Sequence, residues 1–302
     1  MQRFYRGRTV TVPVIDRVPY ADGAPFVRDH PRVTFEKWQA LGNDYVILEE
    51  AELPFELTPQ RVTKLCAPHT GVGSDGVLLL SHTDEPGFVA ELRIFNPDGS
   101  EAELSGNGAR EAILYLRRHG WTPSDTFSIQ TRAGEIRPTI TGPTTCTMDM
   151  GRARLVGEGE LEAANRTWRY RAISIGNPQC AIAVDDPDAL DLQTIGPPIE
   201  NHPLFPNRTN VSFYAERAPG TIRARIFERG VGETLASGTG ASGAAAAYVL
   251  AGGDSPVTVV LDGGELEVEV SDDLHVNLTG WAVPVYRGEL ADEFIEELHA
   301  TR

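Results

Sequence analysis

Short apolar runs separated by glycine, proline, asparagine and aspartate recur along the chain, and they predict a protein rich in β-strands. In some runs apolar and charged side chains alternate, as in Leu266–Val270, which is typical of a strand with one solvated face. Strands are predicted in the N-terminal half at Val33–Trp38, Tyr45–Glu49, Val77–Leu80, Ala90–Phe95, Phe127–Thr131, Glu135–Ile140 and Thr145–Met150. In the C-terminal half they are predicted at Trp168–Ile175, Ala181–Val184, Asn210–Tyr214, Ile222–Phe227, Val257–Leu261, Leu266–Val270, His275–Leu278 and Trp281–Tyr286.

Helical signals are fewer. Thr58-Pro59 is a typical helix start, with threonine as the cap and proline in the first turn, and it precedes a buried stripe of Val62, Leu65 and Cys66. Further helices are predicted at Glu111–His119, Ala241–Leu250 and Asp292–His299, whereas Pro197–Asn210 is predicted to be a loop. Many strands with one long helix per half favour an α+β fold over a doubly wound sheet.

The chain contains an internal repeat. Arg225-Ile226-Phe227 repeats Arg93-Ile94-Phe95, and the turn Ser105-Gly-Asn-Gly-Ala returns as Ser237-Gly-Thr-Gly-Ala, both at an offset of 132 residues. Gly42-Asn43 returns as Gly176-Asn177 at an offset of 134 residues. Three repeats in nearly the same register predict two copies of one structural unit.

The repeat defines a predicted division of the chain. Residues 1–32 contain four prolines and show no clear hydrophobic period, so they are predicted to be an N-terminal extension with one strand at Thr9–Ile15. Residues 33–148 with 282–302 are predicted to form the first half, and residues 149–281 the second. A chain of 302 residues is long enough for two units of this size.

Charge and composition narrow the choice of partners. A net charge of −16 disfavours binding to nucleic acid, because an acidic surface repels phosphate. No run reaches the roughly 18 apolar residues of a membrane span, and the N-terminus lacks the apolar core of a signal peptide. Cys66, Cys146 and Cys180 show neither a disulfide framework nor a metal-binding spacing. We therefore expect a cytoplasmic protein without a metal and without a membrane or nucleic-acid partner.

The two serine turns carry the candidate chemistry. A helix N-terminus that follows glycines presents unpaired N–H groups and the positive end of the helix dipole, which suits a small anion such as an α-carboxylate. Two such ends in one cleft place one side chain on each face of a ligand, which is the arrangement that racemisation or epimerisation needs. Arg110, in the first turn of the first of these helices, is expected to pair with a carboxylate.

Several motifs resemble those of the diaminopimelate epimerase family. They are QALGNDYVILE, HTGVGSDGVLLL, RIFNPDGSEAELSGNGAR, GNPQCAIAV, NRTNVSF and ERGVGETLASGTGASGAAAA, and they run in the family's order from about Val33 to the C-terminus. The resemblance implies two similar halves, each a helix wrapped by sheet, with the site in the cleft between them. It also implies cofactor-independent conversion of LL- to meso-diaminopimelate in lysine synthesis, and a homodimer.

The same resemblance implies roles for individual residues. Ser105 and Ser237 occupy the positions of the family's two catalytic cysteines. The residues implied to bind the amino-acid substrate are Asn43, Asn96, Gly106, Asn107, Asn177, Asn210, Glu228, Arg229, Gly238 and Thr239. Among these, Gly106, Asn107, Gly238 and Thr239 are expected to supply donors to the reacting carboxylate.

The chain departs from the family pattern at the reacting groups. Gln179 stands where the family has histidine, and Ser242 stands where relatives often carry a third cysteine. Serine is a much weaker acid than cysteine and needs a separate base. Three functions follow: an epimerase whose serines work with a carboxylate such as Glu103, Glu228 or Glu233, a related isomerase acting on another amino acid, or an amino-acid-binding protein that does not turn its ligand over.

Overall fold

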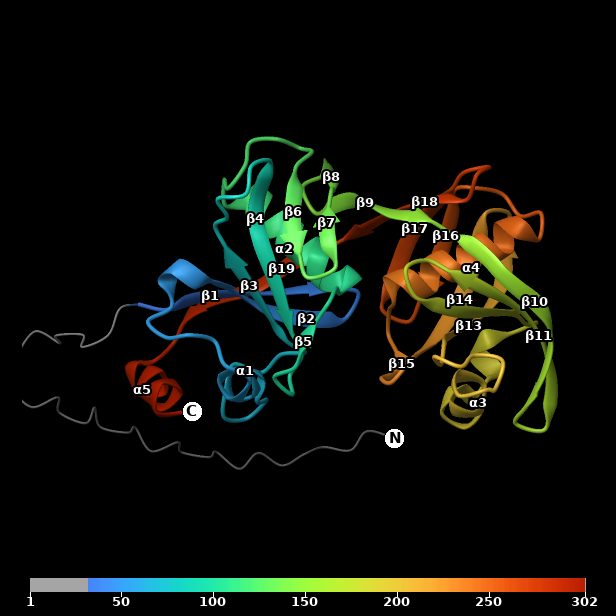
Figure 1. Cartoon of the computed structure of the whole chain (residues 1–302), viewed down its shortest axis with the longest axis horizontal. Helices are drawn as coiled ribbons and strands as arrows, with labels where there is room; N and C mark the ends of the chain where they lie inside the picture. The colour runs from blue at the N-terminus through green and yellow to red at the C-terminus, as the bar shows by residue number, and fades with distance from the viewer. Residues whose placement is uncertain (1–31, 302) are drawn as a thin grey trace, which may run out of the picture.

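The computed structural model describes residues 32–301, so the strand predicted at Thr9–Ile15 lies outside the described residues. The described chain is α+β and forms two lobes, each with one long helix inside a curved sheet (Figure 1). The first sheet has the order β19-β1-β2-β3-β4-β6-β7 and the second β10-β11-β12-β13-β14-β16-β17-β18-β9-β8. The α+β fold with two pseudo-symmetric halves is therefore confirmed.

The first sheet is built mainly from the N-terminal half of the chain. Its strands are β1 (Thr34–Ala40), β2 (Asn43–Glu49), β3 (Val77–Ser81), β4 (Phe88–Phe95), β5 (Glu101–Ala102), β6 (Ser128–Thr131), β7 (Gly134–Ile136) and β19 (Val283–Glu289). The second sheet contains β8 (Thr139–Gly142), β9 (Thr145–Arg152), β10 (Arg154–Ala163), β11 (Arg166–Ser174), β12 (Pro178–Ala183), β13 (Asn210–Ala218), β14 (Thr221–Glu228), β15 (Gly232–Thr234), β16 (Val257–Leu261), β17 (Gly264–Val270) and β18 (His275–Trp281).

The helices follow the same repeat as the strands. They are α1 (Pro59–Cys66), α2 (Gly106–Arg118), α3 (Leu192–Glu200), α4 (Gly238–Leu250) and α5 (Asp292–Ala300), with short 3-10 turns η1 (Glu50–Glu52) and η2 (Pro187–Ala189). α2 and α4 have 13 residues each and begin at the two serine turns. None of the helices between residues 32 and 301 is both long and apolar enough to span a bilayer.

The pairing of the strands shows how closely the halves correspond. β2 pairs with β3 in parallel, as β12 does with β13, and both β4–β6 and β14–β16 are parallel pairs on the next step. Each of these parallel connections needs a crossover, and α1, α3, α2 and α4 supply them in turn. The duplication read from short motifs thus extends over whole units of the fold.

β9 serves both lobes. It pairs with β18 in the second sheet, and β8 pairs with β9, although both precede or overlap the predicted boundary at residue 148. β9 also contacts α2 of the first lobe, and in Figure 1 it passes from one lobe to the other. By sheet membership the second unit starts near residue 139, so the predicted division of the chain stays a prediction.

Two elements differ from the sequence-based expectation. β10 was not predicted, because its charged and glycine-rich sequence has no apolar run. α3 begins inside a segment whose later part, from Pro197, was predicted to be a loop, and it holds Pro197 and Pro198 within the helix. Proline removes helical hydrogen bonds, but the buried Leu192 and Ile199 pack into a core with Phe213 and Phe227 that holds the helix in place.

α4 is surrounded by strands of its own sheet and depends on small side chains. It contacts strands from β11 to β18, and Ala241 and Ala244–Ala247 are fully buried. A methyl group placed on Gly240 or Gly243 would lie within 3 Å of Ile226 or Gln179, respectively. The helix therefore fits its sheet only because these positions carry little or no side chain.

A larger side chain in α4 should destabilise the protein. We expect Ala245→Leu to lower the free energy of unfolding by about 1–3 kcal/mol, because the enclosing strands leave no space for three more carbons. Chemical denaturation would measure the loss. The same change at the exposed Ala300 in α5 is the control, and equal stability of the two variants would contradict a close-packed α4.

Candidate active site

The two serine turns meet at the centre of the molecule. The Ser105 hydroxyl caps α2 by accepting from the Gly108 N–H at 3.1 Å, and the Ser237 hydroxyl caps α4 by accepting from the Gly240 N–H at 3.2 Å. A methyl group on Gly106 would lie 3.8 Å from the Gly238 Cα, so the helices abut at their N-termini. Two positive dipole ends therefore converge, and an anion between them would offset their repulsion.

Both serines line one cleft of about 820 Å³. Of the substrate-binding residues implied by the sequence, Asn43, Asn96, Gly106, Asn107, Glu228 and Gly238 line the same cleft. The tertiary structure thus brings together groups from both halves that lie up to about 190 residues apart in the chain.

The remaining predicted residues lie elsewhere. Asn177 and Arg229 line a neighbouring cleft of about 900 Å³, whereas Asn210 and Thr239 line neither cleft. The Asn210 amide is buried and bonded within the protein, since its Oδ1 accepts from the Arg229 N–H at 2.8 Å and its Nδ2 donates to the Pro178 carbonyl at 3.2 Å. Thr239 accepts from Asn177 at 3.2 Å. In this structure these two residues support their neighbours rather than face the serine cleft.

A chain of polar contacts fixes the amides on the α2 side. Arg110 donates to Asn107 Oδ1 at 2.6 Å, Asn107 Nδ2 donates to Asn43 Oδ1 at 3.4 Å, and Asn43 Nδ2 donates to Asp75 Oδ2 at 2.9 Å. Arginine can only donate and an ionised aspartate can only accept, so these two ends set the orientation of both amides. Each amide keeps a second N–H for a ligand.

The expected partner of Arg110 was wrong. Its guanidinium is fully buried and donates to uncharged oxygens, namely Asn107 Oδ1, the Gly106 carbonyl at 3.1 Å and the Trp281 carbonyl at 3.5 Å. Burial lowers the pKa of Arg110 to about 10. The arginine therefore ties the first turn of α2 to the strand that ends the second half.

The two serines have different polar neighbours. Tyr45 donates its hydroxyl to Ser105 Oγ at 3.2 Å, and burial raises the pKa of Tyr45 to about 12, which keeps the phenol protonated. Ser237 instead interacts with the carboxyl of Glu228. Burial raises the pKa of Glu228, and the Thr234 and Ser237 hydroxyls oppose part of that rise. One serine thus has a donor beside it and the other has a potential base.

Position separates the three candidate carboxylates. Glu228 lines the serine cleft, whereas Glu103 lines the neighbouring cleft. Glu233 is held in an ion pair by Arg225 and lines neither cleft. Of the three, Glu228 alone lies in the same cleft as both hydroxyls.

Gln179 and Ser242 do not face this cleft. Gln179 is buried and donates to Asn177 Oδ1 at 2.6 Å, and Ser242 is buried and donates to the Gly238 carbonyl at 2.8 Å. Cys66, Cys146 and Cys180 are also buried, and none pairs in a disulfide. Among residues 32–301, no cluster of three or more histidine, cysteine, aspartate or glutamate side chains could hold a metal ion.

Tyr45 and Asp75 line the cleft but were not among the predicted site residues. Both lie in motifs that the sequence had singled out, GNDY and GVGSDG. Their contacts to Ser105 and Asn43 span 60 and 32 residues, so the local pattern carried no sign of them.

Comparison with known proteins agrees with this geometry. The sequence profile described as diaminopimelate epimerase matches residues 35–156 and 171–285. The diaminopimelate epimerase of Synechococcus elongatus is 39% identical over 274 residues, which cover 85% of this chain and 97% of that protein. That of Pelotomaculum thermopropionicum is 40% identical over 281 residues, with 84% and 98% covered.

The chain belongs to the diaminopimelate epimerase family. Solved structures share its fold at low identity. A PhzF-family phenazine biosynthesis protein from Bacillus anthracis superposes with a TM-score of 0.66 at 16% identity, over 86% of this chain and 99% of that one. A hydroxyproline epimerase from Agrobacterium vitis, solved with trans-4-hydroxy-L-proline, gives 0.61 at 14% identity, over 88% and 94%. The fold of this diaminopimelate epimerase family member is thus found with several activities.

Glu111, in the second turn of α2, is a buried acid without a hydrogen-bond partner. Its side chain is fully buried, and neither carboxyl oxygen has a partner. Burial raises the pKa of Glu111 well above its usual value, and the positive charge of Arg110 opposes only part of that rise. The folded protein therefore keeps a proton on Glu111 that the unfolded chain releases.

This proton makes stability depend on pH. The Glu111 contribution is full below the unfolded pKa of about 4.3 and is lost as pH rises toward the folded pKa, by about 1.4 kcal/mol for each unit between the two. We expect Glu111→Gln to be more stable than the natural protein at pH 7–8, with the difference shrinking toward pH 4. Denaturation across this range would test it, with Asp84→Asn at an exposed carboxylate as the control. A pH-independent difference would contradict a protonated Glu111.

Proposed function

We propose that the protein is a cofactor-independent amino-acid epimerase that inverts an α-carbon between Ser105 and Ser237, with LL-diaminopimelate as its substrate and meso-diaminopimelate as its product. The observation that carries the proposal is the position of both hydroxyls in one cleft, at two helix N-termini that abut. Membership of the diaminopimelate epimerase family supports the choice of reaction and substrate.

The proposed reaction moves one proton on each face of the substrate. Ser237 Oγ takes the α-proton while its own proton passes to the Glu228 carboxylate, which breaks the Cα–H bond and leaves a carbanion. N–H groups at the start of α2 and α4 offset the charge that builds on the substrate carboxylate. Ser105 then delivers its proton to the opposite face, and its oxygen is reprotonated by way of Tyr45 and solvent.

The buried carboxyl is central to a mechanism without cysteine. Burial raises the pKa of Glu228, so its ionised form is a stronger base than a solvated glutamate. Glu228 lines the cleft and interacts with Ser237, which places it where a proton leaving the serine would go.

The replacement of both cysteines supports a second candidate, an amino-acid-binding protein without turnover. A serine hydroxyl is a far weaker acid than a thiol, so proton abstraction is harder with the same geometry. Both candidates use the same cleft, and a related isomerase acting on another amino acid would use it as well. Binding alone therefore does not separate them.

Exchange of the α-proton in D2O separates the candidates. We expect the protein to incorporate deuterium at the α-carbon of LL-diaminopimelate, and Ser105→Ala and Ser237→Ala each to lose inversion, with mass spectrometry and chiral separation as the readout. Exchange of other amino acids but not of diaminopimelate would identify a related isomerase. Binding by calorimetry without exchange of any amino acid tested would reject the epimerase and support the binding protein.

Removal of the carboxylate tests the base. We expect Glu228→Gln to slow deuterium incorporation about 100-fold or more, the usual contribution of a positioned base. The rate of the natural protein should also rise with pH through the raised pKa of Glu228, because only the ionised form accepts a proton. Glu265→Gln, at an exposed position of β17, is the matched control, and equal rates for the two variants would exclude Glu228 as the base.

Restoring thiols tests whether acidity limits the rate. We expect the double variant Ser105→Cys/Ser237→Cys to exchange at least about tenfold faster, because a thiol pKa near 8.5 falls further at a helix N-terminus. The change keeps the side chains close to the same size. A double variant no faster than the natural protein would show that the pocket, not the acidity of the two groups, has diverged.

A further inference from the structure

Each half contains the same arginine–glutamate pair next to its serine turn. Arg93 binds Glu101 through Nε at 3.0 Å and Nη2 at 3.1 Å, and Arg225 binds Glu233 through Nη2. Both members of the second pair follow those of the first by 132 residues, the offset of the serines themselves. The ion pair is therefore part of the repeated unit, although neither arginine lines the serine cleft.

The pair joins a long strand to the very short strand that leads into the serine. Arg93 lies on β4 and Glu101 on β5, a strand of two residues that pairs with β4 only at Ile94–Ala102 and Phe95–Glu101. Arg225 on β14 and Glu233 on β15 repeat this register. Each serine follows its glutamate by four residues. With so few backbone contacts, the side-chain pair supplies much of what fixes the start of the turn.

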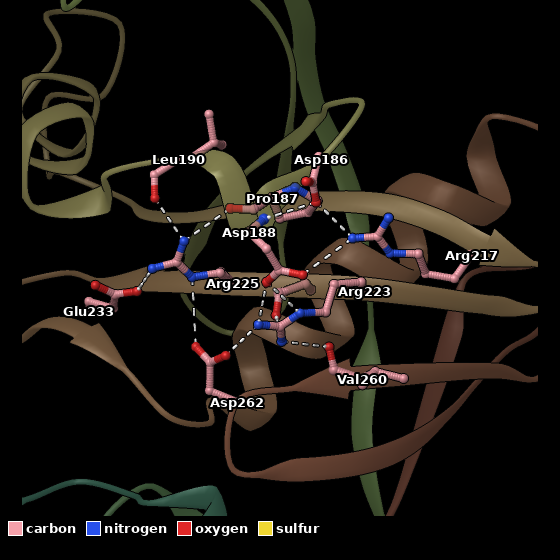
Figure 2. A network of polar contacts seen from close by, with 11 residues as sticks. Asp186, Pro187, Asp188, Leu190, Arg217, Arg223, Arg225, Glu233, Val260 and Asp262 are labelled. Atoms are coloured by element: carbon pink, nitrogen blue, oxygen red, sulfur yellow. Dashed lines mark hydrogen bonds and ion pairs between the residues drawn. The ribbon is translucent and has the colours of Figure 1, made fainter. Parts of the chain in front are cut away.

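The surroundings of the two pairs differ. The Arg93 and Glu101 side chains are 37% and 25% exposed, whereas those of Arg225 and Glu233 are 16% and 23% exposed. Arg225 also donates to the Pro187 carbonyl at 3.0 Å and the Leu190 carbonyl at 2.8 Å, so its guanidinium lies between β15 and the η2 segment (Figure 2).

Further charges brace the second pair. Asp262 lies 3.7 Å from Arg225 and also pairs with Arg223, which in turn binds Asp188 at 2.7 Å (Figure 2). Arg217 binds Asp186 at 2.8 Å and Asp188 at 3.3 Å. A network of several charges holds its members more firmly than one half-exposed pair, which water and salt screen.

We propose that Arg93–Glu101 and Arg225–Glu233 are repeated clamps that position the two serine turns, and that they differ in stiffness. The network-braced clamp holds the Ser237 turn rigid, and the isolated clamp lets the Ser105 turn adjust to a ligand. The arginines and glutamates are positioning residues that act through the serines. The use of this difference in proton transfer rests on the proposed function, whereas the difference in stiffness can be measured without turnover.

Hydrogen–deuterium exchange of the full chain tests the clamps. In the natural protein, amides of residues 101–108 should exchange about tenfold faster than those of 233–240, because fewer contacts oppose local opening. Arg93→Gln should speed exchange of residues 101–108 about a further tenfold, the effect of losing a charged hydrogen bond. Arg225→Gln should speed exchange of 233–240 and also of 186–191.

A matched control and a rescue complete the test. Arg117→Gln breaks an ion pair with Asp125 of the same sequence separation, whose arginine is 39% exposed, and it should leave both turns unchanged. The charge-swapped variant Arg93→Glu/Glu101→Arg should return exchange of residues 101–108 toward the natural rate. Unchanged exchange in Arg93→Gln, or no rescue by the swap, would overturn the clamp, and equal exchange of the two natural turns would overturn the difference in stiffness. These outcomes do not depend on whether any amino acid is epimerised, so the clamp and the proposed function fail separately.

Discussion

The convergence of two helix N-termini is the constraint on which this structure depends. α2 and α4 abut at Gly106 and Gly238, where any larger side chain would separate them, and both direct unpaired N–H groups toward one cleft. Two positive dipole ends at such close range repel each other, and a carboxylate bound between them removes that cost. The rest of the fold, with one sheet around each helix, holds this arrangement in place.

Burial gives the cleft its chemical character. The sheet around α2 encloses Arg110 and Glu111, and the resulting desolvation alters both pKa values while leaving the arginine to orient Asn107. The same effect acts on Glu228 beside Ser237. A site that lacks thiols must gain base strength elsewhere, and a carboxyl shielded from water provides it.

Duplication gave the halves one backbone but not one set of side chains. Tyr45, which donates to Ser105, has Gln179 at the repeated position, and Asn96 has Glu228. A donor therefore stands by one serine and a carboxyl by the other, and the braced and isolated ion pairs next to the turns differ in the same sense. A pseudo-symmetric scaffold can thus hold two unequal proton-transfer groups, which a reaction in one direction across a planar intermediate uses.

The sequence by itself determined the α+β fold, the duplication, the capped starts of α1, α2 and α4, and the serine turns, because these depend on spacings within a few residues or on a repeated motif. Tertiary structure alone decided that Asn210 and Thr239 lie outside the serine cleft while Tyr45 and Asp75 line it. It also kept α3 helical through two prolines and gave Arg110 uncharged partners. The reason is physical: local patterns fix which face of a strand or helix is buried, whereas the neighbours of a side chain come from segments far away in the chain, brought together by packing.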